Sequence, residues 1–313
     1  AFVERHAALQ RKSPQMRRGL GPLLGDGLFI SDGKTWADRR GTVAAVVHAR
    51  NLPAFFPVMT DVAGEWRARW QGLAGGPPVD VLHEMGDLTA EVITRAVFGS
   101  ELGREHAAEI VGGFAEFQRT FDNVDLHALL DLPGWVPRPP RPGVDRAVQR
   151  ITRVVDHLVE RLIATRDREE DADTFVVKML NARDANGRPF SPEAIRNEAI
   201  VTFLAGQETT ATTLAWALFL LSEADWARER LRVETDRVLG GRMPTLEDLP
   251  RLTYTRAVVD ETLRLYPPIP VLGREAVGAT TVADETVRPG AQVTVAPWLL
   301  HRNPKLWREP DRF

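Results

Sequence analysis

The chain has 313 residues, of which 43% are hydrophobic and 27% charged, and its formal net charge is -3 at pH 7. This hydrophobic content is enough to bury a substantial core, which argues against a disordered chain. The near-neutral charge gives no global basic field that would attract nucleic acid or an anionic membrane. Cysteine is absent, which excludes disulfides and Cys-ligated zinc or iron–sulfur clusters within these residues.

The first residues lack an initiator Met and show no basic region followed by an apolar stretch, so no export signal is visible. Residues 199–221 have the length of a membrane span, but they carry a charge, Glu208, near their centre. On insertion scales such a charge costs about 2.5–3.5 kcal/mol. The sequence therefore predicts a buried helix of a soluble, cytoplasmic protein and no membrane anchor.

Helical patterns dominate the chain between Gly and Pro punctuation. They cover residues 34–48, 58–71, 83–98, 107–121, 144–166, 192–222, 224–239 and 254–265. The longest helix begins at Ser191-Pro192-Glu193, a capping residue followed by a first-turn proline and an acid. It is apolar on nearly all sides, which is typical of a helix that crosses a core.

Two stretches between the predicted helices read as connections. Residues 132–143 hold five prolines, so they cannot form a helix. They form either a stiff surface connection or a lid loop between two helices. The acidic run 169–173 is most simply a solvated loop.

After Pro267-Pro268 the pattern changes to short β-branched segments bounded by Gly or Pro. Residues 270–276, 280–287 and 292–296 are predicted as strands of a small sheet beside the helices. The fold class is therefore mainly α with a small β component.

The centre of the longest helix carries an unusual polar motif, Ala205-Gly206-Gln207-Glu208-Thr209-Thr210. Gly206 costs up to about 1 kcal/mol against alanine in a helix interior, and a buried Glu208 needs a partner. In one explanation, Thr209 bonds the carbonyl one turn earlier and bends the helix, and Glu208 pairs with an arginine. In the other, the glycine opens a groove for a small ligand, to which the acid and the hydroxyl relay protons.

This motif, followed by ATTLAW, resembles the oxygen-activation signature of the cytochrome P-450 family. The resemblance implies that Thr209 hydrogen-bonds bound O2 and that Glu208 supplies protons for the cleavage of its O–O bond. It also implies that Ala205 and Gly206 border the haem. Phe203 and Leu204 are expected to line an apolar substrate pocket.

The segment Asp260-Glu261-Thr262-Leu263-Arg264-Leu265-Tyr266-Pro267-Pro268 resembles the Glu-x-x-Arg helix of the same family. A Glu three residues before an Arg is usually a surface contact, so the proline pair and the following strand supply the specificity. The resemblance implies that Glu261 and Arg264 form a buried ion pair with a downstream arginine. Their implied role is structural rather than catalytic.

Two further segments resemble the family's haem-propionate sites. The strand at 270–274 is expected to line the substrate pocket with Val271 and Leu272, and to offer Arg274 to one propionate, which an arginine fork suits. Trp36 and Arg40, four residues apart after a glycine-rich loop, resemble the pair that holds the other propionate. The resemblance implies no metal ligand in these residues and an axial cysteine beyond Phe313.

The resemblance covers nearly all 313 residues, and it implies one cytochrome P-450 domain that lacks its N-terminal sheet region and its C-terminal haem-binding region. It further implies haem b, O2 as cosubstrate, and electrons from NAD(P)H through a ferredoxin or flavoprotein reductase. The intact protein is expected to hydroxylate or otherwise oxidise a lipophilic small molecule as a monooxygenase. Residues 1–313 alone are expected to bind haem weakly or not at all and to be inactive.

Two alternatives stay open from the sequence. The chain could be a haem-free helical interaction fragment. It could also be an all-α, Mg²⁺-dependent terpene synthase, an interpretation that only the acidic residues at 170–173 support. Magnesium-dependent release of diphosphate would favour the synthase.

Overall fold

The computed structural model describes residues 9, 11–120, 141–165, 173–184, 186–282 and 284–313. Most of the proline-rich connection and most of the acidic run lie outside these residues, so neither of those two predictions is tested.

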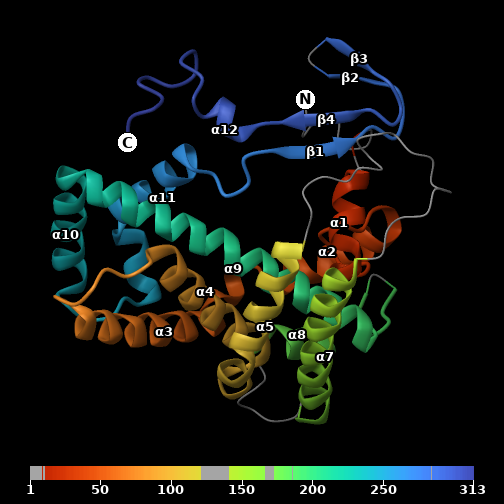
Figure 1. The fold of residues 1–313 in the computed structure, drawn as a ribbon, viewed down its shortest axis with the longest axis horizontal. Helices are drawn as coiled ribbons and strands as arrows, with labels where there is room; N and C mark the ends of the chain where they lie inside the picture. The colour runs from red at the N-terminus through yellow and green to blue at the C-terminus, as the bar shows by residue number, and fades with distance from the viewer. Residues whose placement is uncertain (1–8, 10, 121–140, 166–172, 185, 283) are drawn as a thin grey trace. The chain divides into compact units, whose positions relative to one another are not determined.

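The described chain is mainly helical, as predicted (Figure 1). Its α-helices are α1 (Pro14–Leu24), α2 (Gly33–Val46), α3 (Leu52–Leu73), α4 (Val81–Phe98), α5 (Ser100–Thr120), α7 (Pro142–Thr165), α8 (Phe175–Asn181), α9 (Pro192–Glu223), α10 (Asp225–Leu239), α11 (Thr253–Leu265) and α12 (Pro297–Leu300). Short 3-10 helices span Ala49–Asn51 and Leu246–Arg251. None of these described helices has the length and apolarity that a membrane crossing requires.

The sequence placed α9 and α11 within one residue of their ends, but it missed or shortened other helices. The helix α3 begins at Leu52, six residues before the predicted start, and accommodates both Pro53 and Pro57. Pro53 lies in the first turn, where the missing N–H has no helical partner, whereas Pro57 lies inside the helix. The helix α1 was not predicted; the Ser13 hydroxyl accepts a hydrogen bond from the Met16 N–H at its start.

The strands form two small sheets instead of the single predicted one. In the first, β1 (Leu272–Glu275) pairs with β4 (Gln292–Val295). In the second, β2 (Thr280–Val282) pairs antiparallel with β3 (Glu285–Val287), with Thr280 opposite Val287. The predicted strand 280–287 is therefore a hairpin. Its turn includes Asp284 at φ +66°, a left-handed conformation that aspartate tolerates.

The chain divides into two compact units, and α4 and α9 each contribute to both. The first unit holds residues 1–49, 94–203 and 273–293, and the second holds 50–93, 204–272 and 294–313. The single domain expected from the sequence stays a prediction.

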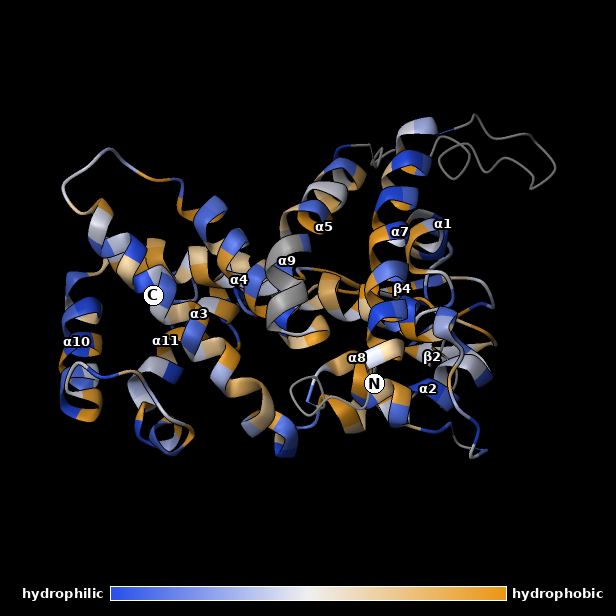
Figure 2. Cartoon of the chain, turned by 90° about the horizontal axis from the view of Figure 1, so that it is seen from below, coloured by the Kyte–Doolittle hydropathy of each residue, from blue (hydrophilic) through white to orange (hydrophobic). Residues whose placement is uncertain are grey.

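The core of the first unit is built around α7. Ala147, Ile151, Leu158 and Leu162 recur at helical spacing on this helix and are fully buried. Charged residues occupy its other faces, so hydrophilic and hydrophobic residues alternate along α7 in Figure 2. The helix therefore owes its place to one apolar stripe.

A smaller cluster in the second unit joins the end of α9 to α10 and α11. Leu221, Ala227 and Val258 are buried there, and Phe313 packs against them. The carboxylate of Glu234, on α10, accepts the backbone N–H groups of residues 254 and 255 at 2.7 and 2.8 Å. These bonds satisfy donors that the first turn of α11 would otherwise leave unpaired.

Candidate functional site

The polar centre of α9 is open to solvent on one side. Ala205, Glu208 and Thr210 are exposed, whereas Gly206 and Thr209 are half-buried. This turn therefore differs from the rest of the helix, which the sequence predicted as apolar on nearly all sides. Exposure removes most of the cost of placing the Glu208 carboxylate in an apolar helix.

The hydroxyl of Thr209 is fixed within its own helix. It donates to the carbonyl of Ala205 at 2.6 Å, and the hydroxyl of Thr213 donates to the carbonyl of Thr209 at 2.8 Å. The hydrogen bond one turn back, which the sequence left as one explanation, is thus present. Because a hydroxyl oxygen also has lone pairs, Thr209 can still accept a hydrogen bond from another group.

The glycine of the motif packs closely against α4. A Cβ atom at Gly206 would lie 2.8 Å from Cδ1 and 3.1 Å from Cγ1 of Ile93. Beside it, the buried hydroxyl of Thr89 lies 3.0 Å from the carbonyl of Gln207. The close approach of α4 therefore explains Gly206 by packing, and its predicted role beside the haem stays a prediction.

The predicted Glu261–Arg264 ion pair is present in the second unit, on α11. Arg264 donates through Nε to Oε2 of Glu261 at 2.8 Å and through Nη2 to Oε1 at 2.6 Å. It also donates to the carbonyls of His301, Pro310 and Arg312, at 2.9, 2.6 and 2.9 Å. The bonds that Arg264 donates to Glu261 raise the pKa of Arg264. One guanidinium thus fixes the segment that follows β4.

The downstream arginine does not join this pair through its side chain. The guanidinium of Arg312 lies 3.3 Å from both carboxylate oxygens of Glu309, and only its carbonyl contacts Arg264. Arg312 is therefore not a third member of this pair through its side chain; the sequence named no particular downstream arginine, so that expectation stays a prediction. Arg264 already uses Nε and both terminal nitrogens on Glu261 and on carbonyls.

The four residues expected to line a substrate pocket have unlike environments. Val271 and Leu272, at the start of β1, are exposed apolar side chains, 53% and 37% accessible. Leu204 is half-buried. Phe203 is only 1% accessible and stacks on Phe114 with ring centroids 5.0 Å apart. Phe203 therefore belongs to the core of the first unit, and its lining role stays a prediction.

Two of the predicted propionate residues come together around a lysine that the sequence did not single out. The ammonium of Lys12 lies 5.4 Å from the ring centroid of Trp36 and donates to the carbonyl of Ser31 at 3.0 Å. Burial lowers the pKa of Lys12, Asp32 opposes this shift, and the nearby charge of Arg274 lowers the pKa further. Trp36, Lys12 and Arg274 thus form one cationic cluster of the first unit.

Arg40, the other predicted residue, is exposed on α2. Its neighbour Arg39 is buried. Arg39 bonds Asp26 and the fully buried Glu198, a network that sequence reasoning missed. Glu198 follows Arg196 and Asn197 at the start of the apolar run of this helix, so no local pattern set it apart.

The cationic cluster fits the carboxylate groups of a haem. An ammonium, a guanidinium and an indole N–H supply donors of the kind that bind carboxylates, and Arg40 adds an exposed cation one turn from Trp36. Among the described residues, no group of three or more His, Asp or Glu side chains could hold a metal ion.

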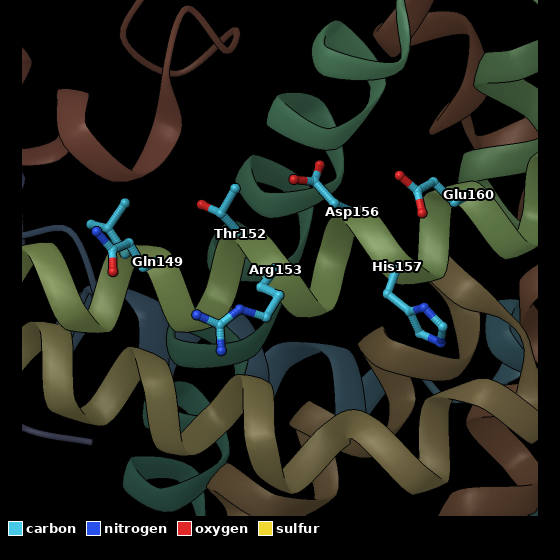
Figure 3. Close-up of a pocket in the computed structure, with 7 residues that line it drawn as sticks. Gln149, Thr152, Arg153, Asp156, His157 and Glu160 are labelled. Carbon is cyan, nitrogen blue, oxygen red and sulfur yellow. The ribbon is translucent and has the colours of Figure 1, made fainter.

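A separate hollow follows α7 and contains none of the predicted site residues. Figure 3 shows that its labelled side chains all project from this one helix. Its lining is polar apart from one valine: Val148, Gln149, Thr152, Arg153, Asp156, His157 and Glu160. Arg196 of α9 pairs with Asp156 at 3.2 Å.

Comparison with known proteins identifies relatives along almost the whole chain. A sequence profile described as "Cytochrome P450" matches residues 2–313. Cyclooctatin synthase of Streptomyces melanosporofaciens is 32% identical over 300 residues, which cover 93% of this chain and 62% of that protein. Cyclooctat-9-en-7-ol 5-monooxygenase of the same species is 28% identical over 297 residues and covers 93% and 62%.

The plant protein LUTEIN DEFICIENT 5, chloroplastic, of Arabidopsis thaliana is 28% identical over 305 residues, covering 93% of this chain and 51% of that protein. The chain thus spans between half and two thirds of the length of these curated relatives.

Solved structures show the same fold. The haem domain of cytochrome P450DA superposes with a TM-score of 0.85 at 24% identity, covering 99% of this chain and 68% of that one. Cyanobacterial CYP120A1, solved with retinoic acid bound, superposes with a TM-score of 0.82 at 22% identity, covering 100% and 68%. The profile match, supported by the 32% identical relative, establishes that the chain belongs to the cytochrome P450 family.

Proposed function

We propose that the protein is a haem-dependent monooxygenase that uses O2 to hydroxylate or otherwise oxidise a lipophilic small molecule. The observation that carries this proposal is the α9 turn at 205–210, where an exposed acid and a fixed hydroxyl lie side by side within an apolar helix. Such a pair can transfer a proton to a ligand placed beside the helix. The family match supports the same activity.

The haem, when bound, supplies the oxygen chemistry, and residues of this chain would bind the haem and deliver protons to the site. Trp36, Lys12 and Arg274, together with Arg40, would bind its carboxylates. Thr209 would hold a proton-bearing partner through its oxygen, and Glu208 would deliver protons from solvent.

The substrate is proposed to be largely hydrocarbon. Val271 and Leu272 present apolar surface at the start of β1, and such surface gains free energy when a lipophilic ligand covers it. One relative is named for cyclooctat-9-en-7-ol, an unsaturated alcohol by its name. A substrate of that class suits these side chains.

Several parts of the proposal rest on the family alone. Electrons would come from NAD(P)H through a ferredoxin or flavoprotein reductase, and a cytoplasmic location stays a prediction. The family match favours the oxygenase over the haem-free fragment and over the terpene synthase.

The test uses Glu208→Gln and Thr209→Ala in the protein as its gene encodes it, loaded with haem. Both variants are expected to lose product formed per NAD(P)H consumed, by about 10²-fold or more as for other general acid–base groups. Thr213→Ala removes a similar back-bonded hydroxyl one turn away and is the matched control, expected to keep its yield. Equal yields from all three variants would overturn the assignment of the α9 turn.

A further inference from the structure

The turn at 25–29 lies directly against α9. Gly25 has φ +56°, a left-handed conformation, and a Cβ atom there would collide with the side chain of Asn197. At Gly27 a Cβ atom would lie 2.6 Å from Cγ2 of Val201. Both glycines are therefore required for the close approach of the turn to the helix.

A buried carboxylate fastens the same turn from the side of α9. Glu198 is 0% accessible, and its two oxygens lie 3.0 and 3.2 Å from the backbone N–H of Leu28. Its Oε1 also accepts Nη1 of Arg39 at 3.0 Å. Arg39 in turn donates to the carbonyl and to Oδ2 of Asp26, at 2.9 and 2.7 Å, and Asn197 donates to Oδ1 of Asp26 at 2.9 Å. One network thus joins α9, the turn and α2.

Stability alone is a poor explanation for this network. A buried ion pair is often no more stabilising than apolar side chains of similar volume, because both charges lose their hydration. Burial raises the pKa of Glu198 in spite of the bonds from Leu28 and Arg39 that oppose it. The directed geometry of the bonds is what apolar side chains could not replace.

The network holds the part of α2 that carries the proposed haem contacts. Arg39 points inward to Glu198, whereas Arg40, the next residue, is exposed, and Trp36 lies one turn earlier on the same helix. Because helical side chains keep fixed angles to one another, anchoring Arg39 also sets the direction of Arg40. The turn likewise fixes Phe29, an exposed aromatic residue that follows the bonded Leu28.

We propose that Glu198 is a positioning residue that sets the placement of the turn 25–29 and of α2, and thereby of Trp36 and Arg40. It acts through Arg39 and through the Leu28 N–H. The proposal rests on the proposed function for its effect on haem, but its effect on the turn is independent of any ligand.

The first test measures hydrogen exchange in the protein as its gene encodes it, before haem is added. Glu198→Gln keeps the size of the side chain but places an amide where two donors now meet one carboxylate. Amides of residues 25–29 are expected to exchange about tenfold faster, because bonds to charged groups are the stronger ones. Amides of α7 and α8 are expected to change less than about twofold, since local openings leave the rest of a domain protected.

Two further variants complete this test. Glu193→Gln is the matched control, because Glu193 lies on the same helix but is exposed and pairs only with Arg196 on the surface. Asp26→Asn changes a largely exposed partner of Arg39, and it keeps the test valid if Glu198→Gln does not fold. It is expected to accelerate the same amides by a smaller factor. Unchanged exchange at 25–29 in both variants, or a uniform acceleration over the whole chain, would overturn the proposal.

The second test measures the rate at which the haem-loaded variants release haem to apomyoglobin. Glu198→Gln is expected to release it about tenfold faster, as for other residues that orient ligand-binding groups, and Glu193→Gln at the unaltered rate. Accelerated exchange with unaltered release would overturn the link to Trp36 and Arg40. Failure of the unaltered protein to take up haem would overturn the proposed function instead, while the exchange test would still decide the role of Glu198.

Discussion

Two ion pairs among the described residues, Glu261–Arg264 and Glu198–Arg39, differ in what they connect. Glu261 and Arg264 lie three residues apart on α11, and Arg264 reaches the carbonyls of the segment after β4. Glu198 and Arg39 lie 159 residues apart, on α9 and α2, and close around a turn. The first pair fixes a chain segment to a helix, whereas the second fixes two helices and a turn to one another.

The pairs also differ in their contact with water. The Glu261 side chain is 33% accessible, whereas Glu198 is fully buried. Burial therefore raises the pKa of Glu198 and makes its charge costly. We therefore infer that the buried charge of Glu198 serves to position its hydrogen-bond partners. The partly hydrated Glu261–Arg264 pair, in which Arg264 makes five hydrogen bonds, serves mainly to stabilise the fold.

The largest expected effect belongs to Arg264. Arg264→Ala leaves Glu261 and three carbonyls without their donor, so the free energy of unfolding is expected to fall by about 3–5 kcal/mol. Denaturant titration followed by circular dichroism measures it. A loss of unfolding free energy below about 1 kcal/mol, the value for an exposed pair, would remove the contrast between the two ion pairs.

A double substitution separates stability from geometry at the other pair. Arg39→Met alone leaves Glu198 buried without its cation and is expected to destabilise by about 3 kcal/mol. Adding Glu198→Leu is expected to restore most of this loss, because apolar pairs replace buried ion pairs at little cost. Haem release is nevertheless expected to stay fast in the double variant. Recovery of slow release together with stability would show that the pair serves stability after all.

The pH dependence of the unfolding free energy provides a smaller effect, whose direction follows from the shifted pKa of Glu198. The pKa of Glu198 lies above 4.5 in the folded protein, so the folded state binds more protons than the unfolded one as the pH rises past 4.5. Its contribution to stability is therefore present below pH 4.5 and is lost as the pH rises through the raised pKa. Unfolding free energies measured at several pH values should show this fall in the unaltered protein and not in Glu198→Gln; identical curves would contradict the raised pKa.

The pKa of the neighbouring carboxylate Asp26 is shifted in the opposite direction, so Asp26 provides a contrast in the same titration. Burial raises its pKa, but the bonds from Asn197 and Arg39 outweigh this and lower it below 3.8. The stability that Asp26 contributes is therefore present above pH 3.8 and lost as the pH falls below it. The two carboxylates thus affect separate pH windows.

The smallest effect is expected at Arg312. Its guanidinium pairs only with the exposed Glu309, so Arg312→Ala is expected to cost less than about 1 kcal/mol. The carbonyl that Arg264 uses remains in the variant. A cost near that of Arg264→Ala would mean that the Arg312 side chain does join the ion pair.

Local patterns account for what the sequence predicted well. The start of α9 follows from Ser191-Pro192-Glu193, and Glu261 with Arg264 could be paired because three residues bring side chains to one helix face. The Glu198–Arg39 pair could not be found in this way, since its partners meet only through the tertiary fold. Glu198 follows two polar residues, Arg196 and Asn197, so the sequence indicated neither its burial nor its partner.

The functional residues show the same limit. Phe203 and Leu204 lie in a helix that is apolar on nearly all sides, so the sequence could not tell that Phe203 faces Phe114 in the core. The sequence predicted that Gly206 opens a groove for a ligand, whereas its contact with Ile93 depends on how closely α4 approaches α9. Lys12 escaped notice because a single lysine near the start of a helix carries no pattern; only the fold brings it to Trp36 and Arg274.

The most direct test of the proposed function is the absorption spectrum of the protein as its gene encodes it, reconstituted with haem, reduced, and exposed to carbon monoxide. The family assignment and the cationic cluster of Trp36, Lys12 and Arg274 predict stoichiometric haem uptake and the red-shifted band of a thiolate-ligated carbonyl complex. Lack of haem uptake, or the band of an imidazole-ligated complex, would contradict a haem-thiolate monooxygenase.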